Sequence, residues 1–194
     1  MTLVLLDTNA YLRLAKRVKP MLGVGFGQKN YVLTILQDVE DEVHRSPNLQ
    51  FKFPWFDDQV IAGERLATRL RLSAAESKIL EVAGSVLRGH VLNNSGNYKT
   101  PPSKTDCRVL AFGQVRSAIV ATNDLSMHQL ASEFSILVWH GHDLLRRMLT
   151  AKMITNDQVR AIFEALEVNG DLPEKWKKAK HAEFVKVFGK PPGG

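Results

Sequence analysis

The sequence predicts an α/β fold in which a parallel sheet of about four to five strands lies between two layers of helices, with further helices at the C-terminus. Two observations predict it. Short, continuous apolar runs at residues 2–6, 31–36 and 118–121 are typical of strands buried on both faces. Segments with helical spacing of apolar residues separate these runs. Such alternation favours parallel pairing through crossover helices.

The composition of the chain limits the class of protein to which it can belong. The chain has 194 residues, of which 44% are apolar and 24% charged, as in globular proteins. The lone cysteine, Cys107, excludes an internal disulfide, and its apolar neighbours predict that it packs in the core. The apolar start lacks a basic leader and is too short to span a bilayer. We therefore expect a cytoplasmic protein with no membrane association.

The first elements alternate as the fold class requires. A strand at residues 2–6 ends at Asp7-Thr8-Asn9, and a helix is expected over 10–18. Glycines 23, 25 and 27 predict a flexible loop at the mouth of a site, because the last glycine of a dinucleotide-binding fingerprint is missing. A strand at 31–36 and a helix at about 38–45 follow.

Residues 46–103 are expected to be an all-helical insertion. A helix is predicted over 59–72, and the capping box of Ser73 and Glu76 begins another that runs to about 88. The segment 89–103 predicts a loop. Trp55 and Phe56 are interpreted as seating a helix against the core, with base stacking as the alternative.

In the second half of the chain, a predicted helix over 106–115 is followed by a strand at 118–121. A predicted helix over 126–133 is then followed by a strand at 135–140. Trp139 is expected in the core. Helices are predicted over 143–152, 156–168 and 173–188. We therefore divide the chain into a domain of residues 1–150, with the insertion at about 46–103, and a helical extension of residues 151–194.

Acidic residues gather where ligands bind in such folds, at the carboxyl ends of the strands. Asp7 follows the first strand, Asp124 follows the third, and Asp106 begins the helix that leads into the third. Glu40 and Glu42 flank the apolar stripe of the helix after the second strand, and helical angle alone does not choose between them. Taken singly, each acid can also be a helix cap or a solvated side chain.

Clustered carboxylates repel one another, and a bound divalent cation relieves the repulsion. Ligand sets made only of oxygen select hard ions such as Mg²⁺ or Mn²⁺. A second metal hypothesis, at His140-Gly141-His142-Asp143, is set aside because imidazoles suit zinc and the spacing matches no zinc motif.

Basic residues are also distributed unevenly within the net charge of +6. Residues 8–37 hold no acid but carry Arg13, Lys16, Arg17, Lys19 and Lys29. This unopposed segment is a candidate for contacting phosphates. The basic stretch 171–190 is interpreted as a soluble surface or a second binding surface.

Four segments in order resemble the motifs of PIN-domain nucleases, a family that includes VapC-like ribonucleases. Leu3-Val4-Leu5-Leu6-Asp7-Thr8-Asn9 is similar to the family's opening motif, and 36–43 to its second segment, in which Glu42 precedes Val43. The segments 105–111 and 119–125 resemble the third and fourth. The resemblance covers about residues 2–145 and prefers Glu42 over Glu40.

The resemblance implies that Asp7, Glu42, Asp106 and Asp124 hold one or two Mg²⁺ or Mn²⁺ ions and are catalytic. It implies polar supports at Asn9 and Thr122. The implied substrate-binding residues are Asn9, Arg13, Lys16, Arg17, Thr122 and Asn123. The implied activity is metal-dependent endonucleolytic hydrolysis of RNA.

The sequence leaves several functions open. The enzyme would be either a toxin with an antitoxin partner or a stand-alone RNA-processing nuclease. The alternatives are a nuclease of single-stranded or flap DNA, and a catalytically quiet module that binds nucleic acid or protein. The long C-terminal extension also makes a homodimer an expectation.

Overall fold

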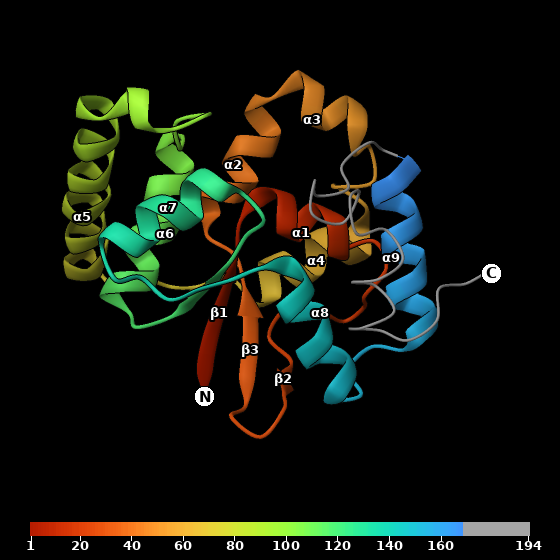
Figure 1. The fold of residues 1–194 in the computed structure, drawn as a ribbon. Coiled ribbons are helices and arrows are strands. Elements are labelled where there is room, and N and C mark those ends of the chain that lie inside the picture. The colour runs from red at the N-terminus through yellow and green to blue at the C-terminus, as the bar shows by residue number, and fades with distance from the viewer. Residues whose placement is uncertain (169–194) are drawn as a thin grey trace.

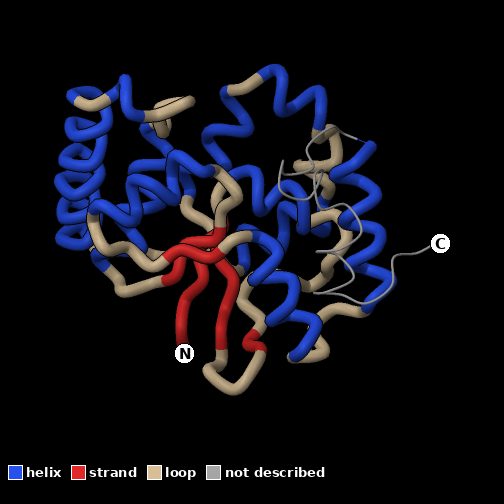
Figure 2. Tube along the Cα trace, viewed as in Figure 1, coloured by secondary structure: helices blue, strands red, loops and turns tan. Residues whose placement is uncertain are grey.

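The fold is built on a central five-stranded sheet with the strand order β2-β3-β1-β4-β5, which is red in Figure 2. The structure, a computed structural model, describes residues 1–168. All strands run parallel except β2, which is antiparallel to β3. The strands are β1 (Thr2–Leu6), β2 (Gly25–Phe26), β3 (Tyr31–Thr34), β4 (Ile119–Ala121) and β5 (Val138–Trp139). The predicted α/β fold with a mostly parallel sheet is confirmed.

β1 lies at the centre of the sheet because its sequence is apolar on both faces. It pairs with β3 on one side and β4 on the other, with Leu5 opposite Thr34 and Leu6 opposite Ala121. Its last three residues, 4–6, are completely buried. An uninterrupted apolar run is what a strand covered by helices on both faces requires.

Helices cover both faces of the sheet and so form three layers, as Figure 1 shows. One side carries α5 (Ala74–Asn93), α6 (Lys104–Val115) and α7 (Leu125–Glu133). The other carries α1 (Thr8–Leu14), α4 (Gln59–Ala67), α8 (Gly141–Thr150) and α9 (Asn156–Val168). Beyond the carboxyl ends of the strands lie α2 (Gln37–Arg45) and α3 (Pro47–Lys52).

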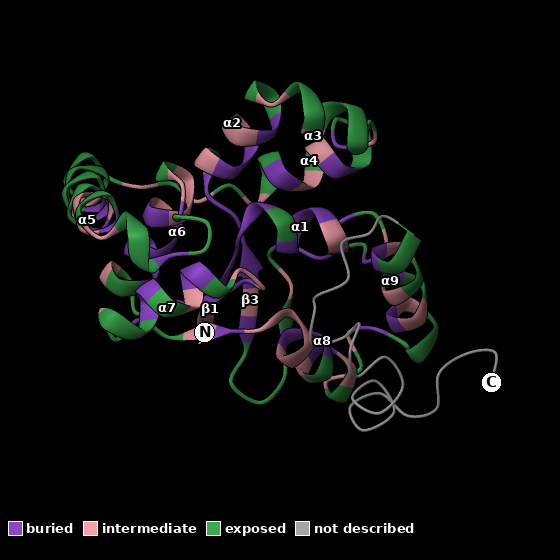
Figure 3. Cartoon of the chain, turned by 45° about the horizontal axis from the view of Figure 1, so that its top comes forward, coloured by how far each residue is buried: buried purple, intermediate pink, exposed green. Residues whose placement is uncertain are grey.

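The helices begin where the sequence supplies caps. The predicted capping box of Ser73 and Glu76 is present at the start of α5, and Ser103 and Asp106 form a second one at the start of α6. α5 packs along α6 through a narrow stripe that includes Leu80, Leu87 and Val91, and most of its remaining surface is exposed in Figure 3.

Several expectations from local pattern differ from the structure. The predicted flexible loop around Gly25 and Gly27 holds the edge strand β2, where Gly27 has a φ of +68°. Two strands separate β2 from β4 in the sheet, so this segment does not border the acids at β1 and β4. A two-residue strand is too short to show alternation.

The other differences concern the insertion, where the helix expected over 59–72 ends at Ala67. The short helix α3 forms where no helix was expected, because Ser46 caps it and Pro47 occupies its first position. α5 extends to Asn93, and a 3₁₀ turn (Ser95–Asn97) follows it, so the predicted loop begins later than residue 89.

The start of the predicted C-terminal extension packs against α1. Arg17 donates from Nε to the carbonyl of Ala161 at 3.0 Å, and Gln158 donates from Nε2 to the carbonyl of Arg17 at 3.0 Å. Val159 and Ile162 join the buried core. The division at residue 150 stays a prediction, and the predicted helix 173–188 lies outside the described residues.

Most of the core residues singled out from the sequence are buried, whereas Trp55 is half-buried against the core. Burial raises the pKa of the Cys107 thiol to about 11, as expected for a packed, unreactive cysteine. Phe56 and Trp139 are also in the core. In the described part of the chain, no helix is both long and apolar enough to cross a membrane.

A buried cation ties the insertion to the sheet domain. The Arg65 guanidinium lies 3.8 Å from the Phe56 ring centroid, donates to the Phe56 carbonyl at 2.6 Å, and pairs with Glu40 at 3.3 Å. The Arg65 side chain is 2% exposed and that of Glu40 is 9% exposed. A buried pair of this kind is costly to break from one side only, because the remaining charge stays buried.

We expect Arg65→Met to lower the free energy of unfolding by up to about 3–5 kcal/mol, because Glu40 keeps only the more exposed Arg69 as a partner and the Phe56 carbonyl loses its donor. Urea denaturation monitored by circular dichroism measures this change. Arg71→Met, at an exposed position after α4, is the control and should change stability by less than about 0.5 kcal/mol. Adding Glu40→Gln to Arg65→Met should restore part of the loss; equal losses in the two arginine variants would contradict this account.

Candidate functional site

Two acids meet at the carboxyl edge of the sheet because β1 and β4 are neighbours. Asp7 is the first residue after β1 and the N-cap of α1, and Asp124 is the N-cap of α7, three residues after β4. The backbone of Asp7 continues the strand pairing, since its N–H donates to the carbonyl of Ala121 at 3.2 Å. Parallel pairing thus brings residues 7 and 124 to the same edge.

Asp7 is a buried carboxylate held on both oxygens. Its Oδ1 accepts a hydrogen bond from the Ala10 backbone N–H at 2.5 Å, and its Oδ2 accepts one from the Thr122 hydroxyl. Burial nevertheless raises the pKa of Asp7 from 3.8 to about 6, with a further upward contribution from the charge of Asp106. The charged form of Asp7 is therefore costly in the fold as it stands.

The structure separates Glu42 from Glu40. The Thr8 hydroxyl donates to Glu42 Oε2, and desolvation with the nearby charge of Asp106 raises the pKa of Glu42. Glu40 instead accepts hydrogen bonds from Arg65 at 3.3 Å and Arg69 at 3.2 Å. Glu42 therefore belongs electrostatically to the strand-end acids, whereas Glu40 has two guanidinium partners.

Asp106 and Asp124 both cap helices. Asp106 Oδ2 accepts from the Ser103 backbone N–H at 2.7 Å, and Asp124 Oδ1 accepts from the Ser126 N–H at 2.7 Å and the Met127 N–H at 3.0 Å. The expectation that a single acid can serve as a helix cap thus holds for Asp7, Asp106 and Asp124. Glu42 lies within α2 and caps nothing.

Asp106 is the electrostatic centre of the group. Burial raises its pKa, and the charge of Asp124 raises it further. Asp106 in turn raises the pKa of both Asp7 and Glu42. Asp106 therefore lies within range of repulsion by each of the other three acids, although the chain supplies hydrogen bonds to all four.

The donor set fits a hard divalent cation in its chemistry. All four side chains offer carboxylate oxygens, and their mutual repulsion is the kind that such a cation relieves. Within residues 1–168, however, no three histidine, cysteine, aspartate or glutamate side chains stand in an arrangement that could already hold a metal ion. The acids are thus near one another without forming a preassembled cage.

Space for a substrate adjoins Glu42. A cavity of about 490 Å³ lies between α2 and the start of α6, and it is lined by Asp38, Asp41, Glu42, Arg45, Ser46, Ser103, Lys104 and Thr105. Acidic and basic side chains both face it. The cavity borders the first turn of α6, which carries Asp106.

The predicted phosphate contacts differ in their surroundings. Arg13 is half-buried on α1, and its charge lowers the pKa of Asp7, so it lies near the acids. Asn9 and Lys16 are exposed. Arg17 uses Nε to hold α9, a structural role that the sequence did not indicate.

Thr122 and Asn123 hold the edge together. The Thr122 hydroxyl donates to Asp7 and accepts from the Asp124 backbone N–H at 3.0 Å, so one side chain orients two of the acids. Asn123 Oδ1 accepts from the Gly141 N–H at 2.9 Å. A Cβ at Gly141 would come within 2.7 Å of Asn123 Nδ2, so a side chain there would displace the Asn123 amide that ties β4 to α8.

Sequence reasoning missed Thr8 and Ser103 as site residues. Ser103 was detectable, because serine three residues before Asp106 is a capping box. Thr8 was not, since its bond to Glu42 joins residues 34 apart in the chain.

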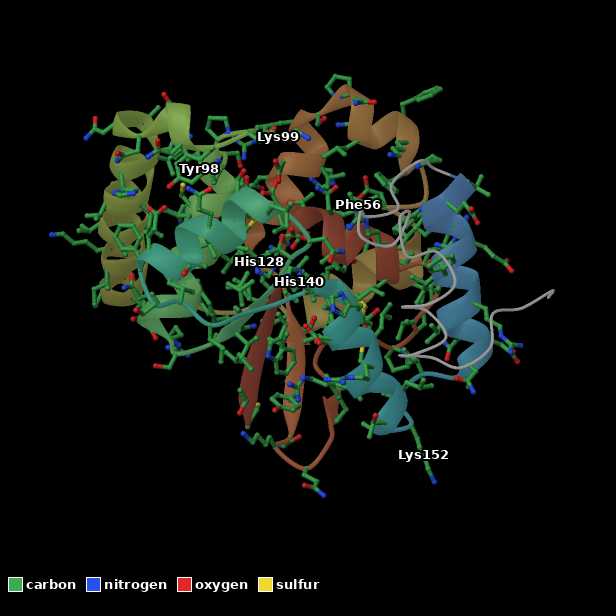
Figure 4. The ribbon with its side chains drawn as sticks, in the orientation of Figure 1. Phe56, Tyr98, Lys99, His128, His140 and Lys152 are labelled. Atoms are coloured by element: carbon green, nitrogen blue, oxygen red, sulfur yellow. The ribbon has the colours of Figure 1, made fainter. Side chains whose placement is uncertain are left out.

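The histidines near this edge form a stack of rings. His128 and His140, labelled in Figure 4, have ring centroids 3.8 Å apart, and His142 follows at 5.3 Å from His140. His128 Nε2 lies 3.0 Å from the carbonyl of Thr122. The metal hypothesis at residues 140–143 gains no support, since the described residues contain no such group.

We expect Asp7→Asn to change the pH dependence of stability in chelator. Because folding raises the pKa of Asp7 from 3.8 to about 6, this residue stabilises the fold relative to the unfolded chain at low pH. That stabilisation, about 3 kcal/mol, is lost as pH rises from about 4 through about 6. The variant lacks this loss. In urea denaturation, its free energy of unfolding should therefore increase relative to that of the wild type between pH 4.5 and pH 7.5.

Asp157→Asn, at a side chain that is 88% exposed, is the matched control and should follow the wild type at every pH. An Asp7→Asn protein that is less stable than the wild type by a constant amount would contradict the expectation. It would indicate that Asp7 serves only as the N-cap of α1.

Comparisons with known proteins do not identify a family. No family model and no curated protein matches the chain. FitAcB from Neisseria gonorrhoeae matches with 14% identity and a TM-score of 0.44, over 71% of this chain and 97% of that chain. VapBC2 from Rickettsia felis, crystallised with a DNA fragment from their promoter, matches with 14% identity and a TM-score of 0.42, over 71% of this chain and 98% of that chain.

Proposed function

We propose that this chain is a metal-dependent endoribonuclease that hydrolyses RNA phosphodiester bonds at the carboxyl edge of its sheet. One observation carries the proposal: Asp7, Glu42, Asp106 and Asp124 come from four separate segments, yet Asp106 repels all three others. Asp7 is buried and the other three acids are half-buried, and a fold does not gather such repelling carboxylates for stability. The order of the four PIN-like motifs supports the same reading.

The four acids would hold Mg²⁺ or Mn²⁺. In Glu42, Asp106 and Asp124, the hydrogen bonds described within residues 1–168 fall on one carboxylate oxygen, namely Oε2, Oδ2 and Oδ1. The second oxygen of each can face a cation. When bound, such an ion lowers the pKa of a water molecule and neutralises the leaving oxygen.

The chain's own residues position these groups. Thr122 and the Ala10 N–H fix the Asp7 carboxylate, and Thr8 fixes Glu42. Arg13 supplies positive charge beside the acids, where it can hold a phosphate next to the one that is cut. Such fixed hydrogen bonds keep the carboxylates oriented before the substrate arrives.

The biological setting follows from the resemblance. We propose either the toxin of a toxin–antitoxin pair, with an antitoxin protein as its partner, or a stand-alone RNA-processing enzyme. A homodimer and a cytoplasmic location belong to the same proposal. Copurification with the product of a neighbouring small reading frame would separate the two settings.

We expect Asp7→Asn and Glu42→Gln each to lower the rate of RNA cleavage on the order of 100-fold or more, because each removes a charge that the cation requires. The assay follows a labelled single-stranded RNA with Mg²⁺ or Mn²⁺, and chelator should abolish cleavage.

Glu81→Gln, an exposed position on α5, is the matched control and should leave the rate unchanged. Cleavage that persists in Asp7→Asn would overturn the assignment. Preferential cleavage of a DNA strand with the same sequence would replace RNA by DNA as the substrate.

A further inference from the structure

A second cavity lies at the far end of α1 from the acids. Its volume is about 310 Å³, and its walls come from α1 and the turn after it, from residues 52–55, and from α9. Figures 1 and 3 both show α1 between the α3–α4 segment and α9. We call this cavity the α1 pocket. Its size is at the lower end for ligand sites, which run from about 300 to 1,000 Å³.

The lining of the α1 pocket is basic and apolar. The charged side chains that line it from the described residues 1–168 are all cationic: Arg13, Lys16, Arg17 and Lys52. The remaining walls include Phe53, Trp55 and, from α9, Ile162 and Leu166. Phosphate groups are attracted by such cations, and flat apolar rings suit the face of a base.

Trp55 is the best-placed ring for such contact. It is half-buried, and it meets Phe53 edge to face with ring centroids 5.8 Å apart and an interplanar angle of 83°. Lys52 Nζ lies 5.7 Å from the Phe53 ring centroid. The aromatic pair and a cation therefore share one wall of the pocket.

The α1 pocket is connected to the acids through one face of α1. Asn9, Arg13 and Lys16 are spaced by four and three residues and so share that face. Arg13 both lines the pocket and acts electrostatically on Asp7. The seven residues of α1, from Thr8 to Leu14, span roughly 10 Å, so a single strand of RNA can reach both places.

We propose that the α1 pocket is a subsite for one unpaired nucleotide of the RNA strand, with its base against Trp55 and its phosphate between Lys16 and Lys52. The inference rests on the proposed ribonuclease function, and it adds a second contact point for the RNA strand, away from the four acids. A base inside a duplex cannot enter a pocket of this size without unpairing.

The test measures binding in chelator, so that no cleavage interferes. The probe is a fluorescein-labelled RNA decamer without self-pairing, followed by anisotropy. We expect Trp55→Ala to raise the Kd about tenfold, because stacking of one base contributes about 1–3 kcal/mol. Trp55→Phe should retain most of the affinity.

Matched controls distinguish the pocket from general effects. Phe51→Ala removes an aromatic ring that is 88% exposed on α3 and should not change the Kd. Lys16→Ala and Lys52→Ala should each reduce the slope of log K against log salt by about 0.7, whereas Lys78→Ala on α5 should not. Thermal melting establishes that each variant is folded.

Three outcomes would overturn the subsite. These are an equal Kd for Trp55→Ala and Phe51→Ala, an equal effect of Trp55→Ala on a duplex of the same length, and competition by hexaglutamate as strong as that by RNA. A wild type that binds the decamer through Trp55 but cuts no RNA would instead overturn the ribonuclease and leave the pocket standing.

Discussion

The carboxylate of Asp7 is the group on which the carboxyl edge of the sheet depends. It joins three elements, because β1 delivers it, the first turn of α1 donates to Oδ1, and Thr122 at the end of β4 donates to Oδ2. Its charge remains costly in this position. The edge is therefore assembled around an acid whose burial opposes folding, and the surrounding apolar core compensates for it.

Capping and ligand binding are compatible roles for the same acids. A cap requires one carboxylate oxygen to accept from backbone N–H groups, and this leaves the side chain in a fixed orientation. Asp106 and Asp124 each use one oxygen in this way. The hydrogen bonds that begin α6 and α7 thus also fix the orientation of the two carboxylates. Helix capping therefore explains only part of the role of each acid.

The sequence predicted the parallel sheet and the strand-end acids because these depend on strong, local patterns. The uninterrupted apolar run before Asp7 and the capping box at Ser73 are examples. It did not predict β2, whose two residues pair through β3, or α3, whose caps are weak signals. Nor could it choose between Glu40 and Glu42 by helical angle. That distinction arises from Arg65 and Arg69, which lie 25 and 29 residues away.

The chain order of the strands has a consequence for synthesis. β1 pairs with β3 early, but its other neighbour, β4, begins at residue 119. The contact between Asp7 and Thr122 spans 115 residues. A ribosome that has released only the first hundred residues thus holds a chain with Asp7 and Glu42 but neither Asp106 nor Asp124. The acidic edge is completed late, after most of the chain has been made, and until residue 106 has been added a growing chain carries at most half of it.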